Sequence, residues 1–174
     1  YNGYTRNYYT VSNGNTIIVM ENVGITGSNG HIGNNLYNKL VSEHVFTQRL
    51  TRQAIIPDGI TRLYDFASYG NKYGQNDTEE IIRANVDRVV SLLNSCLDRG
   101  LKSIVLTSTS SVLLPTLTPY AESKDRMEDL ATNFAKNTGE NIVVVRPSTV
   151  TGIGESPDRL IPKLIHSALT GAVM

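Results

Sequence analysis

Short apolar runs alternate with longer amphipathic segments through most of this chain. The predicted strands cover residues 22–26, 45–47, 60–67, 104–107 and 142–146. The predicted helices cover residues 30–41, 77–100, 119–139 and 156–171. Several strands are apolar at every position, as in Val143-Val144-Val145, which is typical of a parallel sheet buried on both faces. The pattern therefore predicts an α/β fold, with helices on both faces of a parallel sheet.

Capping residues set the expected limits of the later helices. Asp77-Thr78-Glu79-Glu80 is a capping box at the start of the second helix. Thr118-Pro119 and Ser156-Pro157 each place a capping hydroxyl before a proline of the first turn. Glycines follow the apolar periodicity and predict the helix ends, at Gly100, Gly139 and Gly171.

Residues 1–20 are polar and aromatic and carry a turn signal, Ser12-Asn13-Gly14-Asn15, between two strand-like runs. This segment is expected to form a hairpin, or else a flexible leader with one strand. It carries no recognisable chemistry. We therefore separate residues 1–20, as an N-terminal extension, from the domain expected over residues 21–174.

Composition narrows the class of protein further. The 174 residues suit one domain, and 16 basic and 16 acidic side chains give no overall attraction to nucleic acid or to an anionic membrane. No apolar run is long enough to span a bilayer. Cys96 is the only cysteine, which fits a reducing compartment, so a cytoplasmic protein is expected. The three histidines are scattered without ligand spacing, so no metal site is expected.

Three glycines follow the first predicted strand at a spacing of three, in Val23-Gly24-Ile25-Thr26-Gly27-Ser28-Asn29-Gly30-His31-Ile32-Gly33. The N-terminus of a helix presents free N–H groups and a partial positive charge, which together can hold a diphosphate. Gly27 fits the tight turn, Gly30 leaves the phosphate's path clear, and Gly33 lets helix and strand pack closely. The alternative is that the three glycines only form a tight corner between strand and helix, which binds no ligand.

A second constellation, Tyr120-Ala121-Glu122-Ser123-Lys124, places a phenol and an ammonium on one face of a helix, about one turn apart. A fixed positive charge stabilises a phenolate, so we expect Lys124 to lower the pKa of Tyr120. Such a pair can transfer a proton to or from a substrate hydroxyl. The hydroxyl cluster Thr107-Ser108-Thr109-Ser110-Ser111 follows a predicted strand, where open α/β sheets bind ligands.

These motifs occur in one order along the chain: the glycines, Asp65-Phe66-Ala67-Ser68, Asn85, the hydroxyl cluster, the Tyr120/Lys124 pair, and a segment beginning Arg146-Pro147-Ser148. In this order the chain resembles the extended short-chain dehydrogenase/reductase family, the group of the NAD-dependent sugar-nucleotide epimerases and dehydratases. The resemblance runs from about Val23 to about Ile165. It implies a Rossmann-type, doubly wound parallel sheet over residues 21–174.

The resemblance also implies roles for individual residues. Tyr120 would be the catalytic acid/base, and Lys124 would hold the nicotinamide ribose. Thr109 would bond the substrate oxygen at the reacting carbon, with Ser108 and Ser110 as its nearest competitors. The residues implied in cofactor binding are Gly27, Ser28, Asn29, Gly30, His31, Ile32, Gly33, Arg49, Arg52, Phe66, Ala67, Ser68, Asn85, Thr107, Lys124, Pro147 and Ser148.

The end of the second strand usually decides between NAD and NADP. An acidic residue there binds the ribose diol, whereas a basic one suits a 2′-phosphate. This chain has no acid at that place but carries Arg49, with Arg52 behind it. NADP is therefore favoured over NAD, unless both arginines are solvated surface charges.

Three departures from the family pattern are visible. The chain between Arg49 and Asp65 is too short for a full third strand and its helix, which leaves no counterpart for the aspartate beside the adenine. The segment from Thr109 to Tyr120 is also short. The chain stops where the family begins its smaller C-terminal domain, so a truncated chain that lacks most of the substrate domain is expected.

The resemblance favours an enzyme that uses NADP or NAD to transfer hydride at a hydroxyl or keto group, and the expected substrate is a nucleotide sugar. One alternative is an inactive dinucleotide-binding or structural module, and another is a small-carbonyl reductase. The family pairs two helices per subunit across a dimer, here those near 77–98 and 119–137. The apolar stripe Met127, Leu130, Ala131 and Phe134 could serve such a homodimer, but packing on its own sheet is the favoured interpretation.

Overall fold

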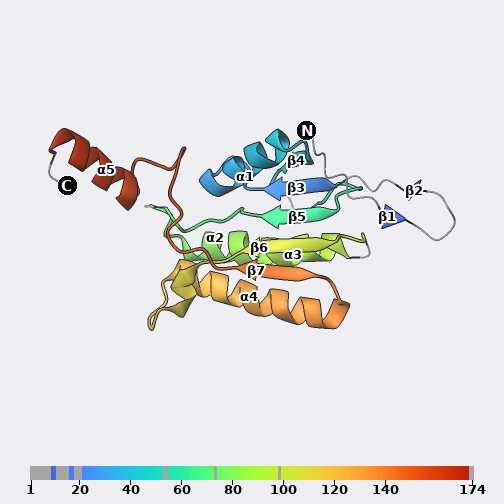
Figure 1. The fold of residues 1–174 in the computed structure, drawn as a ribbon. Helices are drawn as coiled ribbons and strands as arrows, with labels where there is room; N and C mark the ends of the chain where they lie inside the picture. Colours follow the sequence, from blue (N-terminus) through green and yellow to red (C-terminus); the bar gives the residue numbers. More distant parts are fainter. Residues whose placement is uncertain are drawn as a thin grey trace.

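A parallel five-stranded sheet forms the centre of the computed structural model, which describes residues 9–10, 16–17, 21–52, 55–72, 74–97 and 99–172 (Figure 1). Its strands, in spatial order, are β4 (Phe46–Leu50), β3 (Asn22–Thr26), β5 (Arg62–Asp65), β6 (Ser103–Thr107) and β7 (Ile142–Val145). The short strands β1 (Tyr9–Thr10) and β2 (Thr16–Ile17) pair antiparallel, as the predicted hairpin requires. The rest of residues 1–20 lies outside the described residues.

The helical elements that accompany the sheet are α1 (His31–Ser42), α2 (Thr78–Ile82), the π-helix η1 (Arg83–Asp87), α3 (Arg88–Cys96), the 3₁₀-helix η2 (Ser110–Leu113), α4 (Pro119–Thr138) and α5 (Leu160–Thr170). The expected caps are present at two of them. Asp77 accepts hydrogen bonds from the N–H groups of Glu79 and Glu80, and Thr118 accepts one from Ala121 N.

The direction in which successive strands are added to the sheet reverses once, at the boundary between β3 and β5. From β3 the chain passes through α1 to β4 on one side, and then returns across β3 to β5, β6 and β7 on the other. Because parallel crossovers are right-handed, this reversal puts α1 on one face of the sheet and α3 and α4 on the other. The carboxyl ends of β3 and β5 therefore flank the crevice where such sheets bind ligands.

The main core lies between the sheet and helices α3 and α4. Leu63, Ile104 and Leu106 of the strands are fully buried against Leu92 of α3 and Met127 of α4. The remaining buried members of this cluster are Ile56, Ile60, Val89, Leu93, Cys96, Leu101 and Ala131. Met127, Ala131 and Phe134 of the stripe on α4 thus pack on their own sheet, as favoured from the sequence, whereas Leu130 is exposed. Cys96 is a buried apolar side chain.

Three local features differ from, or sharpen, the sequence-based expectation. The described residues between β4 and β5 form neither strand nor helix, so the short connection expected from the sequence is confirmed. The predicted helix over 77–100 is divided into α2, η1 and α3. The last helix begins at Leu160, because Pro157 and Asp158 form a turn that delays it beyond the predicted start at 156.

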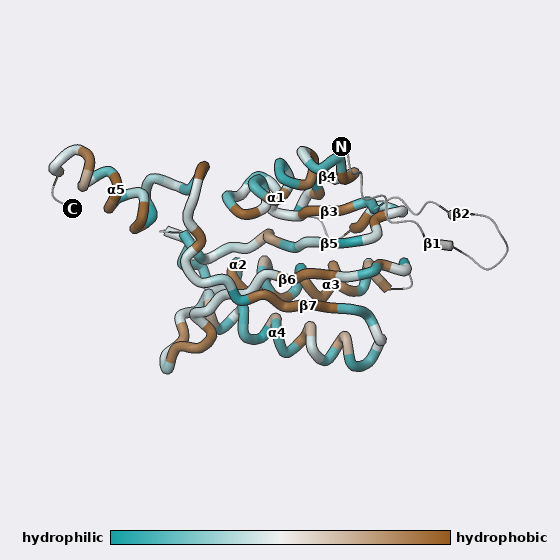
Figure 2. Tube along the Cα trace, in the orientation of Figure 1, coloured by the Kyte–Doolittle hydropathy of each residue, from teal (hydrophilic) through white to brown (hydrophobic). Residues whose placement is uncertain are grey.

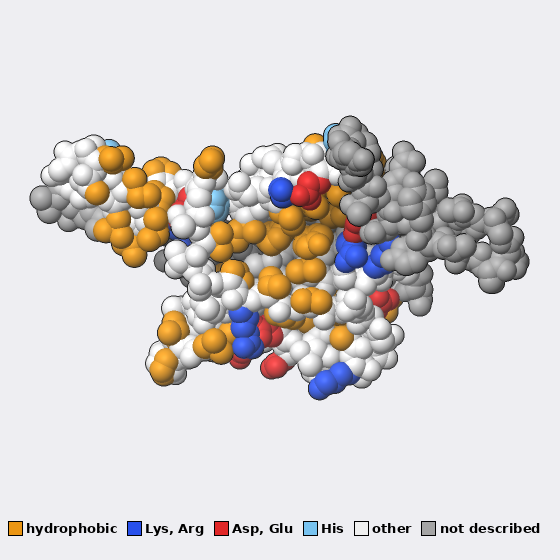
Figure 3. Space-filling model, viewed as in Figure 1, with side chains coloured by type: hydrophobic (Ala, Val, Ile, Leu, Met, Phe, Trp, Pro, Cys, Tyr) orange, Lys and Arg blue, Asp and Glu red, His pale blue; other side chains and the backbone are white. Residues whose placement is uncertain are grey.

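Two apolar surfaces of the described chain have no covering element. Val143 and Val145 of β7 are 44% and 37% exposed on the face opposite α3 and α4. Hydrophobic side chains gather over the sheet on the face drawn in Figure 3, and β6 and β7 are among the most apolar segments in Figure 2. Helix α5 projects away from the sheet (Figure 1) and has no buried residue.

Candidate functional site

The glycine-rich loop connects β3 to α1 and lies directly against the segment after β5. Gly27 has φ +63°, and a Cβ on it would lie 2.5 Å from the carbonyl carbon of Phe66 and 2.6 Å from Ala67 N. A Cβ on Gly33 would lie 2.5 Å from Gly27 O. Two of the three glycines therefore have the predicted roles: Gly27 makes the tight turn and Gly33 permits the close packing of α1.

The N-terminus of α1 is left open to an anion. Gly30 is the N-cap and is exposed, no side chain caps the helix, and its first turn contains no acidic residue. Ser28 is buried, Asn29 is exposed, and His31 and Ile32 are half-buried at the start of the helix. Uncapped N–H groups beside a loop that excludes side chains suit a phosphate or diphosphate group.

Arg49 lies beside this loop, at the end of β4. Its guanidinium stacks 3.8 Å from the centre of the Tyr37 ring and donates to Asn34 Oδ1 at 2.9 Å and to Ser28 O. Arg52 is exposed. The structure thus brings Arg49 to the predicted cofactor loop, with donors already bonded to the protein. The choice of NADP over NAD stays a prediction.

Helix α4 carries the predicted catalytic pair toward the same edge of the sheet. Tyr120 lies in its first turn, and Lys124, one turn later, is only 2% exposed. Lys124 Nζ donates to Thr107 O, at the end of β6, at 2.8 Å. Thr109 Oγ1 accepts from Ser111 N at 3.2 Å and so caps η2. Of the competing hydroxyls, Ser108 is buried and donates to Glu128.

Burial is the main cause of the pKa shifts of both Lys124 and Tyr120. It lowers the pKa of Lys124 to about 8, although the carboxylates of Asp65 and Glu128 act in the opposite direction. Burial raises the pKa of Tyr120 above its ordinary value, against the effect of the Ser68 hydroxyl. The expected lowering of the Tyr120 pKa by Lys124 is therefore wrong for this arrangement, in which the ammonium bonds a backbone carbonyl.

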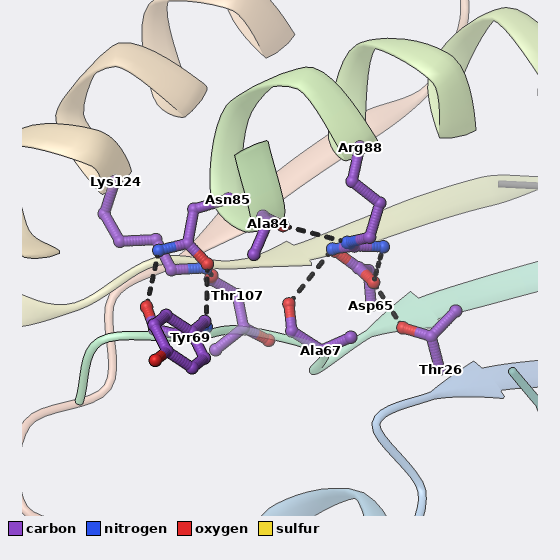
Figure 4. Close-up of polar contacts among 9 residues, drawn as sticks. All are labelled: Thr26, Asp65, Ala67, Tyr69, Ala84, Asn85, Arg88, Thr107 and Lys124. Atoms are coloured by element: carbon purple, nitrogen blue, oxygen red, sulfur yellow. Dashed lines mark hydrogen bonds and ion pairs between the residues drawn. The ribbon is translucent and has the colours of Figure 1, made fainter. Parts of the chain in front are cut away.

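Asn85 is completely buried within η1, and its amide bridges two parts of the site (Figure 4). It accepts from Tyr69 N at 3.0 Å and donates to Tyr69 O at 2.7 Å and to Ser123 Oγ at 3.0 Å. Ser123 in turn donates to Tyr120 O at 2.7 Å. The amide of Asn85 therefore links the segment after β5 to the first turn of α4.

The remaining predicted residues lie at the carboxyl ends of the strands. Phe66 stacks on Tyr64 with ring centroids 6.4 Å apart, and Ala67 is buried behind it. Pro147 O accepts from Ser110 N at 3.0 Å, so the segment after β7, including the exposed Ser148, lies beside η2. The site residues predicted from the sequence are thus collected along one edge of the sheet.

Two ionic contacts of this edge were missed in the sequence, one buried and one with its arginine 45% exposed. Asp65 pairs with Arg88 beneath the glycine loop, and Glu128 of α4 accepts from Arg146 Nε at 2.9 and 3.0 Å. Burial alone would raise the pKa of Glu128, but the hydrogen bonds from Arg146 and Ser108 hold it below its ordinary value. An acidic residue at the end of an apolar strand was the available signal for Asp65.

A cavity of about 300 Å³ opens beside Tyr120 and was also not predicted. Its lining includes Lys72, Gln75 and Thr118. Gln75 Oε1 accepts from Gly70 N at 3.1 Å and from Lys72 N at 3.2 Å, which fixes the wall of the cavity. In the described part of the chain, no group of three or more His, Cys, Asp or Glu side chains could hold a metal ion.

The comparisons with known proteins agree with this arrangement. The sequence profile of the NAD dependent epimerase/dehydratase family matches residues 23–174. Over 161 residues the chain is 26% identical to the trifunctional UDP-glucose 4,6-dehydratase/UDP-4-keto-6-deoxy-D-glucose 3,5-epimerase/UDP-4-keto-L-rhamnose-reductase of Arabidopsis thaliana. That match covers 78% of this chain and 23% of the plant protein.

Solved structures with the same fold include an NAD dependent NDP-hexosamine 5,6-dehydratase of tunicamycin biosynthesis, at 26% identity and a TM-score of 0.73. The match covers 86% of this chain and 62% of that one. UDP-glucuronic acid 4-epimerase from Bacillus cereus, solved with NAD, has 22% identity and a TM-score of 0.70, over 85% of this chain and 63% of its own. The chain therefore spans less than two thirds of the length of these relatives.

Proposed function

The chain belongs to the NAD dependent epimerase/dehydratase family, and from this premise we propose that it binds a nicotinamide dinucleotide and acts on a hydroxyl or keto group of a nucleotide sugar. The observation that carries the proposal is the convergence of Tyr120, Lys124 and Thr109 on the edge of the sheet that holds the open N-terminus of α1. Proton-transfer and phosphate-binding groups are thus available at one crevice.

The residues present fit the dinucleotide. The loop from Gly27 to Gly33 would receive the diphosphate at the uncapped N–H groups of α1, and Lys124 would hold the nicotinamide ribose. Bound NAD supplies a reversible acceptor for hydride. We infer NAD as the cofactor from the family, and Arg49 supports testing NADP beside it.

Tyr120 is the proposed acid/base. Its raised pKa keeps the phenol protonated at neutral pH, which is the form that donates a proton to a keto oxygen. In the reverse direction the base is the phenolate, which takes up the proton of a substrate hydroxyl and returns to the phenol. Thr109 would donate a hydrogen bond to that substrate oxygen and hold it against Tyr120.

The cavity beside Tyr120 is the proposed place of the sugar. Its wall offers an ammonium from Lys72 and an amide from Gln75, both suited to the hydroxyl or phosphate oxygens of a nucleotide sugar. Structures of MoeE5 with UDP-glucose and NAD and with UDP-glucuronic acid and NAD, at 24% and 25% identity, support this class of substrate.

A dinucleotide-binding module without turnover is the second candidate. It is favoured by the short connection between β4 and β5, which supplies no strand beyond β4 among the described residues to flank an adenine. The two candidates share the dinucleotide site and differ in whether Tyr120 transfers a proton to a bound substrate.

A titration with NADH and NADPH, followed by nicotinamide fluorescence, tests the shared part of the proposal. We expect saturable binding that is lost in Gly30→Phe, because a ring there would fill the phosphate's path, while Asn38→Phe, at an exposed position later in α1, serves as the control. Arg49→Ala should weaken NADPH binding more than NADH binding if the arginine selects the phosphate. Absence of binding to either nucleotide would contradict the proposal.

Turnover is tested by incubating the chain with NAD and UDP-glucose and following the nucleotide sugar by mass spectrometry and NMR, because an epimerase or dehydratase returns the hydride and leaves no net NADH. The enzyme predicts conversion of the sugar that is lost in Tyr120→Phe at unchanged NADH affinity. Nucleotide binding without any conversion, across UDP- and dTDP-sugars, would favour the module over the enzyme.

A further inference from the structure

A buried ion pair lies beneath the glycine-rich loop and is used by none of the roles assigned above (Figure 4). The side chains of Asp65, at the end of β5, and Arg88, at the start of α3, are 3% and 11% exposed. Arg88 Nη2 donates to Asp65 Oδ2 at 2.7 Å, and Nη1 donates to Oδ1 at 3.1 Å. The contact is therefore the two-pronged pairing that fixes the orientation of both groups.

The same two side chains tie three backbone segments together. Thr26 Oγ1, at the end of β3, donates to Asp65 Oδ1, and Arg88 Nη2 donates to Ala67 O at 3.0 Å. Arg88 Nε donates to Ala84 O, within η1, at 3.0 Å. The network thus fixes the ends of β3 and β5 relative to the helix behind them.

The glycine loop lies between the end of β3 and the segment that follows β5. Gly27 follows Thr26 directly, and it approaches the backbone of Phe66 and Ala67 so closely that a Cβ would overlap them. A displacement of either strand end would therefore move the loop and the N–H groups of α1. The ion pair thus lies behind the segments that hold the glycine loop.

A buried ion pair is a poor means of gaining stability, because the free energy needed to desolvate both charges offsets their attraction. Apolar residues of similar volume often replace such pairs without loss of stability. A pair at this point, whose bonds join the ends of β3 and β5 to η1, is better explained by the geometry that it fixes.

We propose that Asp65 and Arg88 are positioning residues of the dinucleotide site, which hold the ends of β3 and β5 at the separation that a diphosphate on the glycine loop requires. This proposal rests on the proposed function. It assigns the pair to affinity for the diphosphate and not to the free energy of unfolding.

The test is the double replacement Asp65→Leu with Arg88→Met, which keeps the volume and removes both charges. We expect its urea unfolding midpoint to stay near that of the wild-type chain, while its Kd for NADH rises about tenfold or more. The Kd for adenosine 5′-monophosphate, which has no diphosphate, should rise by less than about threefold. Arg83→Met, which removes an exposed ion pair with Glu80 on the same helix, should leave both values unchanged.

Unchanged NADH affinity in the folded double variant would overturn the positioning role while leaving the proposed function intact. If the double variant does not fold, Arg88→Lys decides, since it keeps the charge but loses the two-pronged geometry. A folded Arg88→Lys chain with weakened NADH binding supports the role, and one with wild-type affinity overturns it. A wild-type chain that binds neither NADH nor ADP-ribose overturns the proposed function itself.

Discussion

Lys124 is nearly inaccessible to solvent, and its burial makes the stability of the fold depend on pH. The pKa of this ammonium is about 8 in the folded chain, against an ordinary value of 10.5. Between these two values the unfolded chain binds more protons at this position than the folded chain does. The Lys124 contribution to the free energy of unfolding should therefore rise by about 3 kcal/mol as the pH increases from 8 to 10.5.

The measurement is urea unfolding of the wild-type chain and of Lys124→Met across this pH range. The difference between the two free energies of unfolding isolates the contribution of Lys124. Cys96 has the opposite dependence on pH, but it is present in both chains, so its effect cancels. Burial raises the pKa of the Cys96 thiol to about 11, so the thiol alone would lower the stability above its ordinary pKa. A difference that does not change with pH would contradict the low pKa of Lys124.

Gly27 has a left-handed backbone conformation, and the backbone of Phe66 leaves no space for a side chain there. Gly27→Ala should lower the free energy of unfolding by about 3 kcal/mol and abolish NADH binding, because strain and overlap with the Phe66 backbone add. Gly139→Ala is the matched control: its φ is +77°, but nothing lies within 4 Å of its Cβ, so it should lose only about 1 kcal/mol. Equal losses would show that space plays no part.

At the residue scale, the glycines and the Tyr120/Lys124 pair could be proposed from spacing and from the order of the motifs along the chain, because each motif is short and local. The Asp65–Arg88 and Glu128–Arg146 contacts join residues 23 and 18 positions apart on different elements. Which residues pair in these contacts depends on which strand ends lie side by side. No local sequence pattern specifies that arrangement. The pKa of Tyr120 could not be foreseen either, since it depends on burial.

Helix α4 is held to the sheet by contacts one turn apart, at Lys124 and Glu128. Glu128→Ala would leave Ser108 and Arg146 without their shared acceptor, and should lower the free energy of unfolding by about 2 kcal/mol. Glu122→Ala on the same helix removes an exposed pair with Arg126 and should change it by less than about 0.5 kcal/mol. Thermal unfolding of the two variants decides, and similar losses would contradict the anchoring role of Glu128.

Element types were predictable, whereas some element limits were not. Parallel strands and amphipathic helices follow directly from the period of apolar residues, and the caps at Thr118 and Asp77 are as expected. The π-turn in η1 was missed because the amphipathic pattern continues through it. It coincides with the buried bonds of Asn85 and Arg88 to the segment after β5, which are tertiary contacts.

The whole molecule leaves apolar surface on β7 and α5 without a covering element in the described chain. We expect the isolated chain to bind an anionic naphthalene dye and to self-associate at micromolar concentration, since contiguous apolar patches favour association. Replacing Val143 and Val145 together by Thr should reduce both effects. Val150→Thr, at a similar exposure of 39%, should not. Sedimentation velocity and dye fluorescence provide the measurement, and an unchanged pair variant would contradict the assignment to β7.

None of the helices in the described part of the chain has the length and hydropathy needed to cross a lipid bilayer. The doubly wound parallel sheet was implied by the resemblance, and the handedness of parallel crossovers then fixes which face of the sheet each helix covers. The apolar surfaces at β7 and α5 were not predicted, because a run of valines has the same sequence pattern whether or not a further layer covers it.

The reversal of the strand order between β3 and β5 divides the described strands into two groups. One comprises β3, α1 and β4, and the other runs from β5 to β7, and among the described elements only β3 and β5 contact each other across this boundary. Local opening should therefore separate the two groups along the crevice. A nucleotide bound there would bridge both, so NADH should slow amide hydrogen exchange most strongly along β3 and β5.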